Sequence, residues 1–195
     1  MELVAQDPSE YLGVGDVIDF GDHSVSTLAS RLRSGCTDDR EFARGAFEYV
    51  RDAIHHSWDV QDPRVTLSAT EVLRHGVGLC FAKSHLLTAL LRCEGIPTGL
   101  CYQRLTDDGQ RPVLHGLIAM YLEGAWHRQD PRGNKTGIDA QFSVENERLA
   151  WPVRTELGER DYPQVFVEPS NVVTTSLRAA SDVLELCEGG LPSDL

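Results

Sequence analysis

The periodicity of the sequence changes at Gly95-Ile96-Pro97. Before this point, apolar residues recur at helical spacing from Cys80 to Leu91, and the Gly-Ile-Pro sequence prevents the helix from continuing. After it, three segments alternate or run apolar as strands do, with short turns such as Glu123-Gly124 between them: residues 98–108, 112–123 and 125–130. This order predicts an antiparallel meander packed on the helix that Cys80 opens, with the mostly apolar second strand at its centre.

The flanking residues are largely helical by the same criterion. Helices are expected at 24–35, from a Thr37 cap to Ile54, at 69–76 behind Ser68 or Thr70, and as one amphipathic helix at 172–188 that ends at Gly189-Gly190. Loops or surface-wrapping segments are expected at 1–24, 55–68 and 139–163, and a turn at Asp107-Asp108-Gly109.

Together these elements predict an α+β fold, in which a helical N-terminal half packs on a small antiparallel sheet. At 195 residues, the chain is long enough for one domain with its own core. We expect a single domain over 1–195, with an N-terminal arm at 1–35, a core at about 38–140, and a C-terminal wrap and helix at 141–195. The oligomeric state is left open.

Composition restricts the partners. The formal net charge is −12, whereas nucleic acids and anionic membranes select a basic surface, so we expect neither as the main partner. No apolar run approaches the ~20 residues that span a bilayer. The acidic N-terminus lacks the basic and apolar regions of a signal peptide.

Five cysteines occur at irregular spacing, with no CxxC pair: Cys36, Cys80, Cys93, Cys101 and Cys187. An odd number without an export signal favours reduced thiols in the cytoplasm over a disulfide scaffold. Cys93 and Cys101 are expected to be core thiols, since free cysteine is commonly buried.

Cys80 differs from the other cysteines in its position. It follows Gly76 and Gly78 and lies at the expected start of a helix. There a sulfur is close to unpaired backbone N–H groups and to the positive end of the helix dipole, which favours a reactive thiolate.

A thiolate nucleophile needs an imidazole partner, and the imidazole needs a third group that fixes its tautomer. His115 lies on the expected middle strand and Asp130 ends the next strand, with one tight turn between the two strands. Adjacent antiparallel strands can bring these two side chains together, and the packed helix can place Cys80 over the same edge.

These residues resemble the transglutaminase-like superfamily of papain-type cysteine enzymes. The stretch GLCFAKSHLLTALLRCEGIPTG is similar to the nucleophile helix of the family, VLHGLIAMYL to its histidine strand, and AWHRQDPRGN to its Trp-x(n)-Asp-Pro segment. The upstream AFEYVRDAIHHSWD and SATEVLRHGVG also resemble the family, so that the likeness covers roughly residues 40–140. Gly116-Leu117 departs from it, because the family often has a small or branched residue followed by an aromatic one there.

The resemblance implies a papain-like fold and a catalytic triad. Cys80 would be the nucleophile, His115 the imidazolium partner and general acid, and Asp130 the residue that orients His115. The backbone N–H of Cys80 would be one oxyanion donor, and the candidates for the second are Trp58, His55 and His56.

The implied reaction is thiol-dependent acyl transfer on a peptide, protein or small amide, through a thioester and without a cofactor. Hydrolysis is favoured over transamidation, because the chain shows no added device for excluding water.

The remaining residues near the expected site have simpler interpretations. Lys83 is expected to be solvated, His127 to lie at the surface or to support the site, and Trp126 to pack in the core.

Three other functions are open. A zinc site could use Cys80, His115 and Asp130, with His55, His56 and His75 as further ligands, although neither HExxH nor CxxC occurs. A non-catalytic binding domain could retain the fold, and such a domain would tolerate Cys80→Ala. An acyltransferase using an acyl-CoA donor would need a long cleft for a phosphorylated cofactor, and no basic cluster near Cys80 supports it.

Overall fold

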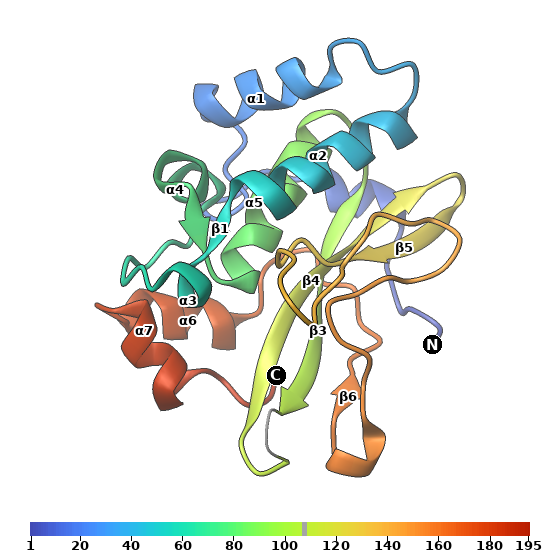
Figure 1. The fold of residues 1–195 in the computed structure, drawn as a ribbon. Coiled ribbons are helices and arrows are strands. Elements are labelled where there is room, and N and C mark those ends of the chain that lie inside the picture. Colours follow the sequence, from blue (N-terminus) through green and yellow to red (C-terminus); the bar gives the residue numbers. More distant parts are fainter. Residues whose placement is uncertain (107–108) are drawn as a thin grey trace.

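The computed structural model describes residues 1–106 and 109–195, so the predicted turn at Asp107-Asp108 lies outside the described residues. Its helices are α1 (His23–Arg33), α2 (Asp39–Ala53), α3 (Ser57–Val60), α4 (Ala69–His75), α5 (Cys80–Cys93), α6 (Asn171–Ala179) and α7 (Val183–Glu185), with shorter helical turns at Pro8–Leu12, Thr155–Leu157 and Leu186–Gly190. Its strands are β1 (His55–His56), β2 (Val77–Gly78), β3 (Thr98–Thr106), β4 (Pro112–Leu122), β5 (Ala125–Gln129) and β6 (Arg160–Asp161) (Figure 1). Helices and sheet together confirm the α+β class.

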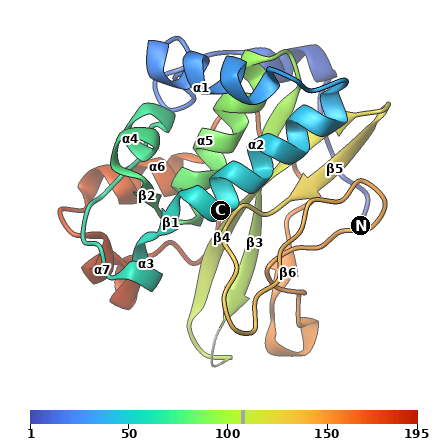
Figure 2. The same cartoon turned by 45° about the horizontal axis from the view of Figure 1, so that its top comes forward.

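Helix α5 lies at the centre of the molecule. Every side chain from Cys80 to Arg92 is buried, including the polar or charged ones of Lys83, Ser84, His85, Thr88 and Arg92. Helices α1, α2 and α4 contact α5, and so do β3 and β4, so that α5 separates the helices from the sheet (Figure 2). This central position fixes the start of α5, and therefore Cys80, against the sheet.

The main sheet has the strand order β5-β4-β3-β6, with antiparallel pairing throughout. The predicted meander of three strands is confirmed, and β4 lies between its two neighbours along the chain. Strand β6 adds a fourth strand, which comes from a segment expected only to wrap the surface. Strand β5 pairs with Ile118–Leu122 alone, so among the described strands none pairs with this edge of β4 from Pro112 to Leu117.

The segment expected to form a loop after α2 contains structure. His55 and His56 form β1, which pairs in parallel with Val77 and Gly78 of β2, and α3 follows directly. Two residues are too few to produce a periodic pattern, and the partner strand lies beyond α4. This short pair joins the end of α2 to the residues that immediately precede Cys80.

Local capping explains two further differences. Helix α2 is capped by Asp38, whose side chain accepts the Glu41 N–H, and not by Thr37. The predicted single helix at 172–188 is wrong: Ala180 is extended, and Asp182 caps α7 as a separate helix by accepting the Leu184 and Glu185 N–H groups. By contrast, Ser68 caps α4 in a reciprocal arrangement with Glu71, as one of the two predicted caps.

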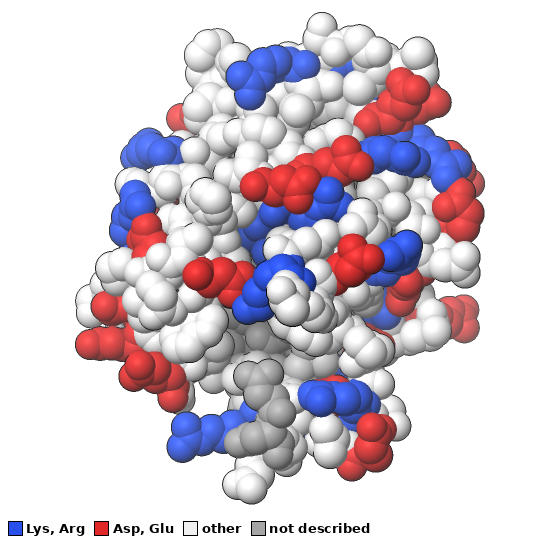
Figure 3. Space-filling view, in the orientation of Figure 1, with Lys and Arg blue, Asp and Glu red and all other residues white. Residues whose placement is uncertain are grey.

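Acidic and basic side chains are both distributed over the surface. On the face shown in Figure 3, acidic and basic side chains are interspersed and form no continuous basic field. Within residues 1–106 and 109–195, no helix combines the length and the apolar character needed to span a bilayer.

Candidate active site

Cys80 is the first residue of α5, and the chain reaches it through the β1–β2 pair. A Cβ at Gly78 would lie 3.0 Å from both the Ala82 methyl and the Thr66 hydroxyl, so any larger residue would have to displace these neighbours at the entry to α5. Leu79 supplies no side-chain cap to α5. The first N–H groups of the helix are therefore left for other acceptors near the sulfur.

His115 and Asp130 meet as the sequence predicts. The Nε2 atom of His115 lies 2.8 Å from Oδ2 of Asp130, and both side chains are almost fully buried. Asp130 also accepts the backbone N–H of Ala150 at 3.0 Å and of Arg132 at 3.1 Å. These bonds fix the carboxylate, which in turn fixes the orientation of the imidazole.

The electrostatics favour an ion pair. Burial alone would lower the pKa of His115, but the Asp130 carboxylate and the Cys80 sulfur outweigh it and raise this pKa above its ordinary value. Burial opposes ionisation of Asp130 as well, yet His115 and the two backbone N–H groups hold the pKa of Asp130 below its ordinary value. Asp130 contacts Nε2, so Nδ1 is the ring nitrogen that is not bonded to the carboxylate, and Cys80 and His115 line the same pocket.

Gly116 is a part of the site that the sequence interpretation missed. Its backbone N–H donates to the Cys80 sulfur at 3.4 Å. A Cβ at position 116 would lie 2.6 Å from Phe81 Cδ1 and 3.1 Å from Phe81 Cα. The departure noted at Gly116-Leu117 thus has a physical reason: only glycine lets β4 approach the start of α5 this closely.

Trp151 was missed as well. Its ring stands edge-on to the His115 imidazole, with 5.0 Å between the centroids and 89° between the planes, and the Arg132 guanidinium lies 5.5 Å from the Trp151 centroid. Trp151 comes from the segment after β5, which has little regular structure and no periodicity. Trp126, in contrast, packs edge-on against Tyr11 at 4.8 Å, as expected for a core residue.

A pocket of about 550 Å³ opens at Cys80 and His115. His56, Trp58 and Trp151 lie on its wall, whereas His55 does not contribute to the lining. The Nδ1 atom of His56 is buried without a hydrogen-bond partner among the described residues. Burial and the Arg132 charge lower the pKa of His56 to about 3, so its imidazole is neutral near pH 7.

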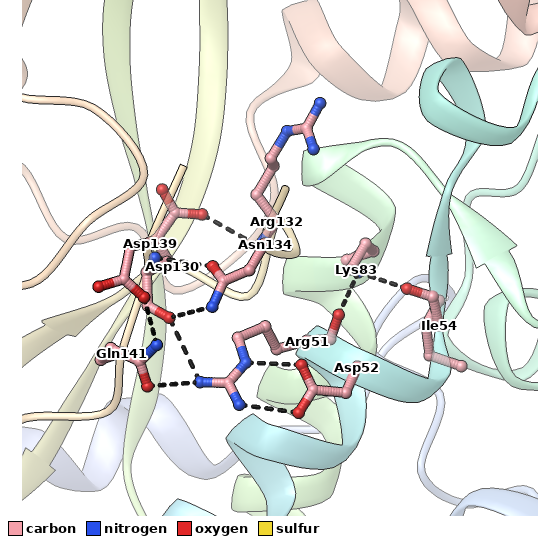
Figure 4. Close-up of polar contacts among 10 residues, drawn as sticks. Arg51, Asp52, Ile54, Lys83, Asp130, Arg132, Asn134, Asp139 and Gln141 are labelled. Carbon is pink, nitrogen blue, oxygen red and sulfur yellow. Dashed lines mark hydrogen bonds and ion pairs between the residues drawn. The ribbon is translucent and has the colours of Figure 1, made fainter. Parts of the chain in front are cut away.

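The prediction that Lys83 is solvated is wrong. Lys83 is fully buried one turn after Cys80, and its ammonium donates to the backbone carbonyls of Ile54 and, at 3.2 Å, Arg51 (Figure 4). These carbonyls lie at the C-terminal end of α2, where a cation complements the helix dipole. The pattern of α5 suggested a surface charge, but α2 covers this face.

The polar layer beside Lys83 continues across the loop after β5. Arg51 pairs with Asp52 at 2.7 Å and donates to Gln141 at 2.9 Å, while Asn134 exchanges hydrogen bonds with the backbone of Ala140 (Figure 4). This layer holds the loop that carries Asp130 against the end of α2.

The other residues considered from the sequence lie away from these contacts. Cys101 is fully buried, as expected, and burial raises its pKa to about 12. Cys93 is partly buried. The ring of His127 lies 3.1 Å from the Leu122 carbonyl. Within the described part of the chain, no group of three or more His, Cys, Asp or Glu side chains is arranged to hold a metal ion.

Comparison with known proteins gives matches of two kinds. The family model of the transglutaminase-like superfamily matches residues 26–131, more than half of the chain. No curated protein matches the sequence. Similar solved structures include a candidate cysteine protease from Cytophaga hutchinsonii, with 16% identity and a TM-score of 0.55, over 66% of this chain and 43% of that one.

The periplasmic domain of TgpA from Pseudomonas aeruginosa matches with 17% identity and a TM-score of 0.48, over 65% of this chain and 48% of that one. The chain spans less than half the length of either solved chain. At these identities the likeness concerns the fold alone.

Proposed function

Because the chain belongs to the transglutaminase-like superfamily, we propose that it is a cysteine acyl-transfer enzyme in which Cys80, His115 and Asp130 form the catalytic triad. The supporting observation is the buried 2.8 Å contact from His115 to Asp130, with the Cys80 sulfur bound by the N–H of the next residue, Gly116, and in the same pocket as His115. A nucleophile, an imidazole and an orienting carboxylate in this order are what thiol catalysis requires.

The proposed reaction proceeds in two steps. The Cys80 thiolate attacks the carbonyl carbon of an amide, and the C–N bond breaks as His115 gives its proton to the leaving amine. The acyl group is then a thioester on Cys80. Neutral His115 takes a proton from the incoming water or amine, which attacks the thioester, and the thiolate–imidazolium pair forms again.

The oxyanion of the tetrahedral intermediate needs hydrogen-bond donors. We assign one to the backbone N–H of Cys80 and the other to His56, in preference to Trp58 or His55. The β1–β2 register places His56 opposite Gly78, two residues before Cys80, and its imidazole is neutral. A neutral imidazole with a proton on one nitrogen can donate to an oxyanion without carrying a charge itself.

The charges around the pocket favour an uncharged amide over an acyl-CoA donor. Lys135 and Arg132 both pair with Asp59, and Arg154 pairs with Glu159. Cations that already have carboxylate partners offer little net charge to a phosphorylated cofactor. The substrate class proposed is therefore a peptide, protein or small amide, with hydrolysis as the main reaction.

Residues 1–195 are proposed to act as one domain, since the main apolar core includes both Val17 and Val183. A cytoplasmic location is supported by the five cysteines, all of which are unpaired.

The experiment is to trap the acyl-enzyme. The protein is incubated with a mixture of blocked peptide amides, with and without hydroxylamine, and is then quenched in acid for intact-mass measurement. We expect a mass increase on Cys80 and a hydroxamate product with hydroxylamine. Free acid without hydroxylamine identifies hydrolysis, and products formed only with an added amine identify transamidation.

Cys80→Ala and His115→Ala are the controls, and neither should form the adduct. If the folded wild-type protein forms neither adduct nor product with any peptide amide while binding one of them, it is a binding domain that retains the fold.

A further inference from the structure

The C-terminal segment, residues 186–195, lies across the candidate active site. After α7 the chain forms one wide helical turn, passes through the exposed Gly189 and Gly190, and ends beside β4 (Figure 1). The side chains of Cys187 and Leu191 line the same pocket as Cys80 and His115. Burial in this pocket, and secondly the Cys80 sulfur, raise the pKa of Cys187 to about 11.

This segment pairs with the free edge of β4. The backbone N–H of Leu114 donates to the Pro192 carbonyl at 2.7 Å. Two residues further along, the Gly116 N–H donates to the Cys80 sulfur. N–H groups that point to the same edge of a strand are two residues, or about 7 Å, apart. The Pro192 carbonyl, bound at Leu114, therefore lies roughly this distance along β4 from the Cys80 sulfur, bound at Gly116.

The outer end of the segment is held by a carboxylate. Asp194 accepts hydrogen bonds from the Arg160 guanidinium at 2.6 Å and from the Tyr162 hydroxyl. About half of the Asp194 and Arg160 side chains is exposed, and exposed ion pairs contribute little and are screened by salt. Leu186, Cys187 and Leu191 pack against the core, and Asp194 also lies 3.9 Å from Arg104 Nε. Beyond the helical turn, the segment is held by the Pro192 main-chain bond, the Leu191 side chain and the exposed polar contacts of Asp194. An extended peptide could make contacts of the same kinds.

We propose that this edge of β4 binds an extended peptide with an aliphatic residue three positions before an acidic one. Residues 186–195 occupy the same edge and therefore compete with such a peptide for it. Leu191 and Asp194 show this spacing, with the carbonyl that Leu114 binds between them. The inference rests on the proposed function, since it names the ligand class and the regulation of the same site. Strand addition of this kind gets affinity from main-chain bonds and specificity from alternate side chains.

The test measures iodoacetamide alkylation of Cys80 and Cys187 at one pH by peptide mass spectrometry. The double variant Leu191→Ala/Asp194→Asn weakens the contacts of Leu191 and of Asp194. Glu188→Gln is the matched control, because Glu188 is exposed in the same segment and the same charge is removed. We expect several-fold faster alkylation of both cysteines in the double variant, and wild-type rates in Glu188→Gln.

A synthetic peptide Leu-Pro-Ser-Asp-Leu, added to the double variant, should slow the alkylation of Cys80 again, and the same peptide with Asn in place of Asp should protect less. Unchanged alkylation of both cysteines in the double variant, or no protection by the peptide, overturns the proposal. Failure of the proposed function gives a different result: Cys187 is released in the double variant, but Cys80 reacts like an ordinary thiol and does not respond to His115→Ala.

Discussion

Gly116 donates its backbone N–H to the sulfur of Cys80 at 3.4 Å, from the strand position next to His115. The contact brings the nucleophile helix and the histidine strand together at one point, and Phe81 leaves no space there for a side chain on residue 116.

Gly116→Ala should therefore separate β4 from α5. A Cβ 2.6 Å from the Phe81 ring forces a shift of backbone or ring, and overpacking of this kind costs about 1–3 kcal/mol in the free energy of unfolding. Urea denaturation measures this loss. Gly45→Ala in α2 is the control, since open space surrounds Gly45 and alanine there should leave stability unchanged or raise it. Equal effects of the two substitutions would contradict the packing argument.

Lys83→Met should destabilise the fold. The substitution keeps the length of the side chain but leaves the Ile54 and Arg51 carbonyls without their buried donor, which costs about 1–3 kcal/mol. Lys135→Met, at the other lysine of the chain, removes a half-exposed ion pair with Asp59 and should cost less than about 1 kcal/mol. Chemical denaturation of both variants measures the two losses in the free energy of unfolding. A larger loss for Lys135→Met than for Lys83→Met would contradict the stabilising role of the buried Lys83 ammonium.

Acid should destabilise the protein between pH 6.5 and 4, partly through His85. Burial lowers the pKa of His85 from 6.5 to about 4, although its Nδ1 atom lies 2.8 Å from the Leu67 carbonyl. The unfolded chain therefore binds a proton that the folded chain does not, and stability falls as the pH drops through this range. Denaturation midpoints measured from pH 7 to 4.5 give the slope.

His85→Asn keeps a donor for the Leu67 carbonyl but does not titrate, so the pH slope should be shallower in this variant. His23→Asn, at an exposed histidine of α1, should leave the slope as it is. A slope that is the same in His85→Asn and wild type would show that His85 already accepts its proton in the folded state.

Asp130→Asn should weaken the ion pair at the site while the fold is retained. The carboxylate is a major cause of the raised pKa of His115. Its neutral replacement should lower this pKa, so that the imidazole loses its proton at a lower pH than in the wild type. The NMR titration of the His115 ring should shift accordingly. Asp139→Asn, at an exposed carboxylate of the following loop, should not change the titration, and an unshifted ring in Asp130→Asn would contradict the assignment.

The three proposed triad residues could be located from the sequence because each lies on a strongly periodic element or directly after one. Their spacing along two hairpin strands and one helix predicts the contact between His115 and Asp130, and the structure contains it.

Other contributors could not be found in this way. Trp151 reaches His115 from a segment without periodicity. Lys83 is buried because α2 covers α5, which is a tertiary effect that local pattern does not encode. The break between α6 and α7 depends on Asp182 as a cap, yet the apolar period continues through it. The β1–β2 pair, which positions His56, is two residues long and joins segments separated by α4.

The most direct test of the central claim is the pH dependence of iodoacetamide alkylation at each of the five cysteines, in the wild type and in His115→Ala. The comparison uses the shape of each rate-against-pH profile and not the absolute rate, because residues 186–195 partly cover Cys80 and should slow its alkylation at every pH. The account predicts that Cys80 alone reacts as a thiolate well below the ordinary thiol pKa of about 8.5, and that His115→Ala removes this behaviour. A Cys80 profile that follows those of the other four cysteines, or that His115→Ala leaves unchanged, would contradict the thiolate–imidazolium pair on which the proposed function rests.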